Sequence, residues 1–167
     1  MDREKIGEIV QRLFVALEKR IPRFLEDPDD MAISKGNAVM LVIDGNGDVH
    51  GKYVGTDLVK QVELGQVAWK KAVQVRLTRV STGRYEELAY SRRLHWWKYG
   101  IPLPEFVGWD GGIPGVLSDG TPLAIAFSGF RGEKDVEILR RAMQDVPEIS
   151  LDVPLPELNP VQPDRWA

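Results

Sequence analysis

A predicted β-hairpin constrains the fold of this chain more than any other feature of its sequence. Residues 38–43 form a continuous apolar run with β-branched members, and residues 49–54 follow after Asp44-Gly-Asn-Gly-Asp. Within that connection, Asn46-Gly47 favours a type I′ turn, because both central residues of such a turn need positive φ. The segment therefore predicts two antiparallel strands.

A second hairpin is predicted closer to the C-terminus. Residues 113–117 and 121–128 flank the turn Ser118-Asp119-Gly120. The segment Leu123-Ala-Ile-Ala-Phe is typical of a central strand that is buried on both faces. We expect a further short strand around residues 105–108, and we expect the two hairpins to join into one sheet.

Apolar residues spaced three and four apart predict three helices around these hairpins. Asp27-Pro-Asp-Asp ends the first helix, because proline cannot continue one. We expect the middle helix to pack on the sheet through an apolar stripe that begins at Leu58 and includes Trp69, and we expect further helical turns within residues 85–96. The three predicted helices cover residues 6–24, 58–77 and 135–144.

Helices placed between hairpin strands indicate an α+β domain with an antiparallel sheet. The 167 residues, 43% of them hydrophobic, fit one domain, which we assign to residues 1–151. Four prolines within residues 152–167 predict an extended tail. The chain has no cysteine, which excludes thiol catalysis, disulfides and iron–sulfur ligation. His50 and His95 are too far apart in the sequence to predict a metal site.

We expect a cytoplasmic protein without a membrane partner. The longest apolar runs are much shorter than the roughly 20 residues that a membrane span needs. The start of the sequence, Met-Asp-Arg-Glu-Lys, is too charged for a signal peptide.

Basic residues are concentrated in the middle of an otherwise acidic chain. Residues 60–98 hold nine basic and three acidic side chains, a net charge of +6, while the rest holds 13 basic and 22 acidic, a net charge of −9. This distribution is compatible with an anionic ligand such as a propionate or phosphate, with an acidic patch of a second subunit, or with a solvated helix face. A sequence pI near 5.5 argues against nucleic acid as a partner.

An aromatic segment beside the basic helix supplies candidate ligand-binding residues. His95 lies among tryptophans and a tyrosine, which is compatible with an axial haem ligand, a proton shuttle or a structural residue. Lys71 or Arg76 would meet the acid groups of a flat ligand, while two glycines would allow either close backbone approach or a tight turn. The candidate ligand-binding residues are Lys71, Arg76, His95, Trp97, Tyr99, Phe106, Trp109, Gly111 and Gly112.

Catalysis remains an alternative to ligand binding alone. Ser128 lacks the Gly-x-Ser-x-Gly frame of a serine nucleophile and no histidine follows it, so serine hydrolysis is excluded. Lys71, His95 or Glu105 would serve as an acid or base on a small metabolite if burial moved its pKa towards neutrality. We expect His50 to be a structural residue of the second strand.

Several short motifs together are a more specific sign of a known family than any one of them alone. In order they are Val42-Ile-Asp-Gly-Asn-Gly47, Lys71-Ala72, Gly111-Gly-Ile-Pro114, Asp119-Gly120, Ala124-Ile-Ala-Phe-Ser-Gly129 and Glu133-Lys-Asp135. In this order and spacing they resemble the GlcG/HbpS-like family over about residues 36–145. That family includes the haem-binding protein HbpS and the C-terminal domain of PduO-type corrinoid adenosyltransferases.

The resemblance implies a profilin-like α+β fold, with a five-stranded antiparallel sheet flanked by helices, and assembly into dimers or larger homo-oligomers. It also implies a small-ligand-binding module whose ligand is haem, a corrinoid or another flat anionic molecule. Haem is thus a candidate cofactor, although the motifs transfer no axial ligand. A small-metabolite enzyme and a structural component of a homo-oligomer are the alternative functions.

Overall fold

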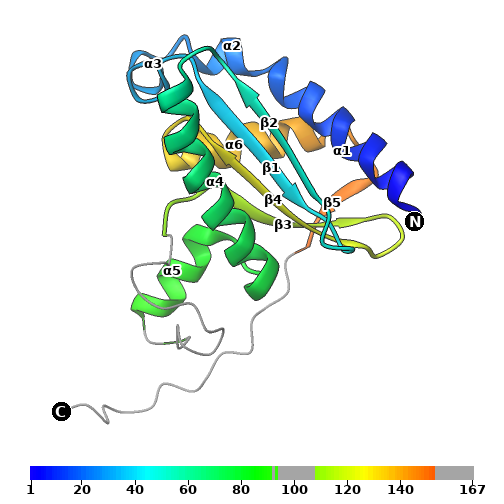
Figure 1. Cartoon of the computed structure of the whole chain (residues 1–167). Helices are drawn as coiled ribbons and strands as arrows, with labels where there is room; N and C mark the ends of the chain where they lie inside the picture. The colour runs from blue at the N-terminus through cyan, green and yellow to red at the C-terminus, as the bar shows by residue number, and fades with distance from the viewer. Residues whose placement is uncertain (92, 94–107, 153–167) are drawn as a thin grey trace, which may run out of the picture.

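The computed structural model describes residues 1–91, 93 and 108–152, which form a five-stranded antiparallel sheet flanked by helices (Figure 1). The strand order β2-β1-β4-β3-β5 confirms the predicted α+β fold. The strands are β1 (Ala38–Ile43), β2 (Val49–Val54), β3 (Gly112–Leu117), β4 (Pro122–Ser128) and β5 (Ile149–Leu151). The helices are α1 (Arg3–Glu18), α2 (Ile21–Phe24), α3 (Pro28–Ser34), α4 (Leu58–Thr78), α5 (Thr82–Tyr90) and α6 (Gly132–Met143).

Both predicted hairpins are confirmed, but the type I′ turn predicted at Asn46-Gly47 is wrong, because Gly47 has φ of +89° whereas Asn46 does not have a positive φ. The Gly47 N–H donates to the Asp44 oxygen at 3.0 Å, so the turn spans residues 44–47. The two hairpins join through β1 and β4. β1 pairs antiparallel with β2, and its other edge pairs antiparallel with β4, so that Val39 lies opposite Ser128 and Ile43 lies opposite Ala124. β4 is the central strand and is buried on both faces, as its uninterrupted apolar sequence predicts.

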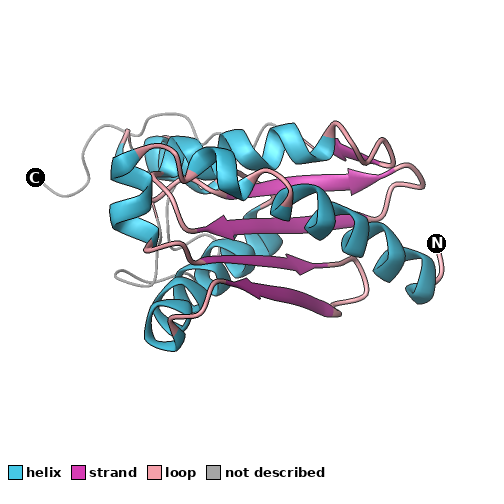
Figure 2. Ribbon diagram, turned by 90° about the horizontal axis from the view of Figure 1, so that it is seen from above, coloured by secondary structure: helices cyan, strands magenta, loops and turns pink. Residues whose placement is uncertain are grey.

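One face of the sheet is covered by α1 and α6, and the other by α4 (Figures 1 and 2). Because side chains alternate across a strand, residues two apart contribute to the same face. Met40 of β1 and Phe127 of β4 contribute to the large core beneath α1 and α6, together with Leu13 and Leu139 of those helices.

The face under α4 is built from small side chains. Ala124 and Ala126 of β4 contact Ala72 and Val75 of the helix. A Cβ atom on Gly112 would come within 2.7 Å of Thr82 and 3.1 Å of Lys71, so only glycine leaves room there. The small residues let α4 lie close to the strands, which places the stem of Lys71 next to β3.

The predicted apolar stripe of α4 is correct only in part. Its member Ala72 packs on the sheet beside Val75, and Ala68 and Lys71 are also buried there, whereas Leu58 and Trp69 of the stripe are exposed. The error has a physical cause, because the small face and the buried lysine carry less apolar signal than the larger side chains on the outer face.

The bounds of the first and last predicted helices also differ from the prediction. The segment 6–24 is divided between α1 and α2, and Asp27-Pro-Asp-Asp begins a further helix, α3, because the Asp27 side chain accepts a hydrogen bond from Asp29 N at 3.0 Å. Likewise α6 begins at Gly132, three residues before the predicted start.

The strand β5 was not predicted from the sequence. Its residues 149–151 pair with β3. Of the strand predicted at residues 105–108, only Gly108 is described and it is not in a strand. The first residue of the predicted tail, Asp152, accepts a hydrogen bond from Arg79 at 2.6 Å, and residues 153–167 lie outside the described part of the chain.

Within the described ranges, even the 21-residue α4 lacks the apolar length that a transmembrane helix requires.

Candidate functional site

A cleft of about 640 Å³ lies where α4, the start of α6 and the C-terminal end of β4 meet. The loop that precedes β3 closes one side of it through residues 108–110. Three of its lining side chains, Lys71, Ser128 and Asp135, are almost completely buried, and we refer to them as the floor. Leu64, Trp109 and Phe130 contribute apolar surface to the walls.

A buried ion pair forms most of the floor. The Nζ atom of Lys71 donates to Oδ2 of Asp135 at 2.8 Å and to the backbone oxygen of Phe127 at 3.0 Å. The other carboxylate oxygen of Asp135 accepts from the Phe130 backbone N–H at 2.8 Å. The pair thus connects α4 and α6 to the end of β4.

Burial changes the protonation of this carboxyl group. Loss of hydration raises the pKa of Asp135 to about 7, although the neighbouring Lys71 ammonium and the Phe130 N–H act in the opposite direction. The Asp135 carboxyl group therefore exchanges its proton near neutral pH, inside a cleft that solvent reaches.

Gly111 and Gly112 make room for this pair. Gly111 has φ of +114°, and a Cβ atom there would lie 2.7 Å from Lys71 Nζ and 2.7 Å from the Phe127 oxygen. Gly112 packs against the stem of Lys71. The two glycines therefore allow close approach, as the sequence suggested, but what approaches them in this structure is the lysine of α4.

Arg131 fixes the position of the loop that leads from β4 into α6. Its backbone N–H donates to Asp30 Oδ1 at 2.9 Å, and its guanidinium donates to both oxygens of that buried carboxylate. The guanidinium also bonds to Asp27, at the start of α3. Through Arg131, the short helix α3 holds the start of α6 against the cleft.

Ser128 differs from the other floor residues because its hydroxyl group has no hydrogen-bond partner among the described residues. The side chain is only 4% exposed and lines the cleft. Its Oγ atom is not among the fully buried polar atoms that lack a partner, so it is open to the cleft and available to a bound molecule.

Acidic side chains predominate around the opening of the cleft. Glu63, Asp110 and Glu133 line it, and we call them the rim carboxylates; Lys60 is the lysine that faces them and pairs with Glu63 at 3.1 Å. Because the charges of Lys71 and Asp135 offset one another when both are ionised, the lining carries a net negative charge.

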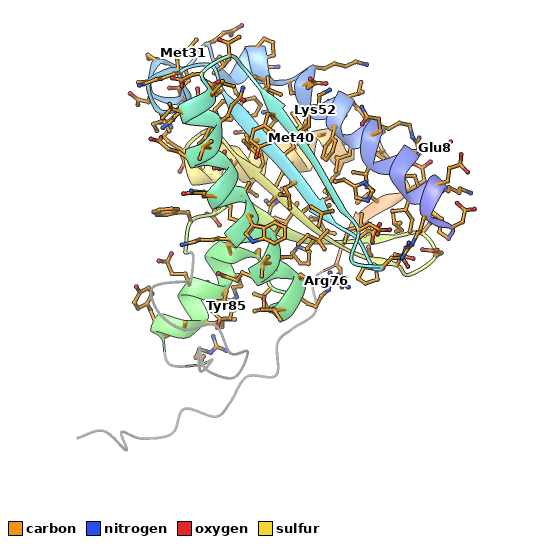
Figure 3. The ribbon with its side chains drawn as sticks, in the orientation of Figure 1. Glu8, Met31, Met40, Lys52, Arg76 and Tyr85 are labelled. Carbon is orange, nitrogen blue, oxygen red and sulfur yellow. The ribbon has the colours of Figure 1, made fainter. Side chains whose placement is uncertain are left out.

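The structure brings some of the predicted ligand-binding residues together and separates others. Lys71 and Trp109 line the cleft, and Gly111 and Gly112 lie beneath it. Arg76 lies towards the C-terminal end of α4 (Figure 3), where it donates to the backbone oxygens of Asp44 at 2.7 Å and Gly45 at 3.1 Å. The predicted residues His95, Trp97, Tyr99, Phe106 and Glu105 lie outside the described part of the chain.

His50 lies at the edge strand and not in the cleft. Its Nε2 atom is 3.2 Å from Oδ2 of the buried Asp44, whose other oxygen accepts the backbone N–H groups of Asn46 and Asp48. These contacts belong to the β1–β2 turn. Among residues 1–91 and 108–152, no three His, Asp or Glu side chains are grouped so as to hold a metal ion.

The sequence analysis missed the site roles of Ser128, Asp135, Asp110 and Glu133. Ser128 was considered only as a nucleophile, and Asp135 only as part of a helix-start motif. A usable signal was present for Asp135, because a lysine within a helix that must cover a sheet needs a buried counter-charge. Nothing in the sequence spacing identifies the rim carboxylates.

Comparison with known proteins gives a likeness in structure alone. No family model and no curated protein matches the sequence. The solved haem complex of PduOC superposes with a TM-score of 0.65, covering 86% of this chain and 95% of that one at 16% identity. Klebsiella pneumoniae protein ORFY, of DUF336, gives a TM-score of 0.62 over 84% of this chain and 88% of its own, at 15% identity.

HbpS superposes with a TM-score of 0.54, covering 80% of this chain and 86% of that one at 14% identity. These likenesses extend over most of each chain, so they concern the overall fold. The resemblance drawn from the short motifs is thereby confirmed at the level of the fold: this chain has the fold of PduOC and HbpS.

Proposed function

We propose that this protein binds a small molecule in the cleft between α4, β4 and α6. The observation that carries the proposal is the unpaired Ser128 hydroxyl in the floor. In the cleft this hydroxyl group is in contact with solvent, and a hydrogen bond to a ligand in place of water contributes about 0.5–1.5 kcal/mol to binding. Exposed Trp109 at the cleft wall offers an aromatic surface for a flat ligand.

Haem is the first ligand to test, with a corrinoid or another flat anionic molecule as the next candidates. The support is that the superposed PduOC structure is a haem complex.

A haemin titration of the purified full-length chain tests this ligand. We expect a shifted Soret band that saturates, and weaker binding by Trp109→Ala than by Trp69→Ala, which removes an exposed tryptophan outside the cleft. His50→Ala and His95→Ala test whether a histidine ligates the iron. A titration without saturation, or equal effects of the two tryptophan variants, would contradict haem binding in this cleft.

A small-metabolite enzyme is the second candidate function, and the Asp135 carboxyl group is the observation that favours it. A group with a pKa near 7 beside a lysine suits proton transfer at neutral pH. An activity found by substrate screening would then follow the ionisation of Asp135 and be abolished by Asp135→Asn. An activity that survives this substitution would assign the chemistry elsewhere.

Self-association is a third proposal and is compatible with either function. Leu58, Val62 and Trp69 form an exposed apolar stripe on the outer face of α4, and Tyr53 of the edge strand lies against Gly65 within it. Contiguous exposed apolar surface marks interaction sites. We propose that a second copy of the chain covers this stripe.

A further inference from the structure

We infer that the floor of the cleft is a donor site for a neutral carbonyl oxygen, as in a primary carboxamide, formed by Lys71 Nζ and Ser128 Oγ. This inference rests on the proposed ligand-binding function and adds the chemical class of the group that reaches the floor. It differs from the expectation drawn from the sequence, in which Lys71 meets an acid group.

The floor has two unused hydrogen-bond donors. A lysine ammonium group carries three N–H donors, and two of those on Lys71 are directed to Asp135 and the Phe127 backbone oxygen. Within the described residues, neither the third N–H nor the Ser128 hydroxyl has a partner. Both side chains line the cleft, and the inference is that one oxygen acceptor bonds to both donors there.

The surrounding charges favour a neutral acceptor over a carboxylate. Asp135 offsets the charge of Lys71 within the floor. Among the described residues that line the rim, Glu63, Asp110 and Glu133 are accompanied by one lysine, Lys60. A ligand carboxylate would therefore approach a net negative lining, at a Coulombic cost that a carbonyl group avoids.

The rim also offers acceptors to the amide nitrogen. The structure records no hydrogen bond to the carboxylates of Asp110 and Glu133 from any described residue. A primary carboxamide presents one carbonyl acceptor and two N–H donors, which matches donors in the floor and acceptors at the rim. The apolar walls, with Leu64, Phe130 and exposed Trp109, accommodate the flat group that carries the amide.

Three probes of the same ring size separate the alternatives: benzamide, benzoate and benzylamine. They are neutral, anionic and cationic at pH 8, respectively. We would titrate each into the ¹⁵N-labelled full-length protein at pH 8 and follow the amide resonances of residues 108–112 and 128–135 by NMR. We expect benzamide to bind more tightly than both charged probes.

Ser128→Ala is the informative variant, because it removes only the hydroxyl group and leaves the ion pair intact. Loss of one hydrogen bond worth about 1 kcal/mol lowers affinity about fivefold, and we expect that loss for benzamide. Ser118→Ala, which changes an exposed serine in the β3–β4 turn, should leave the affinity for benzamide within about twofold.

Benzoate binding as tightly as benzamide, or an unchanged benzamide affinity in Ser128→Ala, would overturn the inference. Absence of any shift with all three probes would overturn it as well. The proposed function is decided separately by the haemin titration, since haem would fill the walls of the cleft whether or not a carbonyl group reaches the floor.

Discussion

Lys71 Nζ lies 2.8 Å from Asp135 Oδ2, and each of the two side chains is 2% exposed. The residues are 64 positions apart in the chain and belong to helices on opposite faces of the sheet. The contact passes the end of β4, where the Phe127 oxygen accepts the second lysine hydrogen bond. The pair therefore fastens the two helix layers together at the floor of the cleft.

Replacing one partner of this ion pair should lower the free energy of unfolding at least as much as replacing both. At pH 8, where both groups are ionised, Lys71→Met or Asp135→Asn alone leaves a buried charge without its partner, and each should lower the free energy of unfolding by about 3–5 kcal/mol. The double variant Lys71→Met/Asp135→Asn should lose no more than the worse single variant. Urea unfolding of all four proteins gives the coupling energy, and simple additivity would contradict the pairing.

Ionisation of Asp135 should make stability depend on pH. Its pKa is about 7 in the folded chain against 3.8 for an unperturbed aspartate, so between these values the folded chain holds a proton that the unfolded chain has lost. This contribution is fully present below about pH 4 and decreases as the pH rises through 7. A ¹³C titration of the Asp135 carboxyl carbon should show a midpoint near 7; a midpoint below 4 would exclude this effect.

The same effect can be checked through unfolding. Relative to the wild type, Lys71→Met/Asp135→Asn lacks the titrating group, so its free energy of unfolding should decline less between pH 4 and pH 7. Equal pH dependence of the two proteins would mean that Asp135 is not the group responsible.

Gly111 should tolerate alanine much less well than Gly120. Both residues have positive φ, but a Cβ atom on Gly120 meets nothing within 4 Å, whereas one on Gly111 meets Lys71, Phe127 and Asp135 below 3 Å. Gly120→Ala should cost only the left-handed strain, about 1–2 kcal/mol, and Gly111→Ala should cost at least 2 kcal/mol more. Chemical denaturation of both variants measures this difference, and equal costs would show that the contact relaxes freely.

Arg76 should stabilise the first hairpin without contributing to ligand binding. Its guanidinium is occupied by the backbone oxygens of Asp44 and Gly45 in the β1–β2 turn. Arg76→Ala should therefore lower the free energy of unfolding by about 1–3 kcal/mol and leave haemin affinity within twofold of the wild type. A large loss of affinity with unchanged stability would restore the role that the sequence analysis predicted for this residue.

A charge placed in the exposed stripe of α4 should prevent self-association. Val62→Lys puts an ammonium group among Leu58, Trp69 and Tyr53, where a second copy would have to bury it. Light scattering should show a smaller assembly for this variant than for the wild type. The control variant Glu8→Lys, at an exposed position of α1, should show no change. A monomeric wild type would contradict the proposal.

Local signals were sufficient for most of the sheet. The glycines and Asn46 between two apolar runs located the first hairpin, although not its turn type, since only Gly47 of the predicted pair has positive φ. The apolar sequence of β4 indicated a central strand, because burial on both faces is visible in the residues themselves. β5 escaped prediction because its three residues form a strand only through pairing with residues 115–117 of β3, a long-range contact without a local signature.

The site was harder to predict than the sheet. Lys71 and Trp109 were identified as candidates, but the packing face of α4 was assigned correctly only at Ala72, because the large apolar residues of the helix are on the outside. The proximity of Asp135 and Ser128 to Lys71 can be predicted only from the strand order, in which β4 lies between β1 and β3. The residue spacing within each segment carries no information on that arrangement.

The close packing of α4 on Ala124, Ala126 and Gly112 limits which substitutions the sheet tolerates without altering the cleft. These small apolar residues keep the distance between α4 and the sheet short, and that distance determines how deep the Lys71 ammonium group lies. Enlarging any of them would raise the helix and draw the ammonium group away from the carboxylate, altering the cleft although none of its charged residues had been replaced.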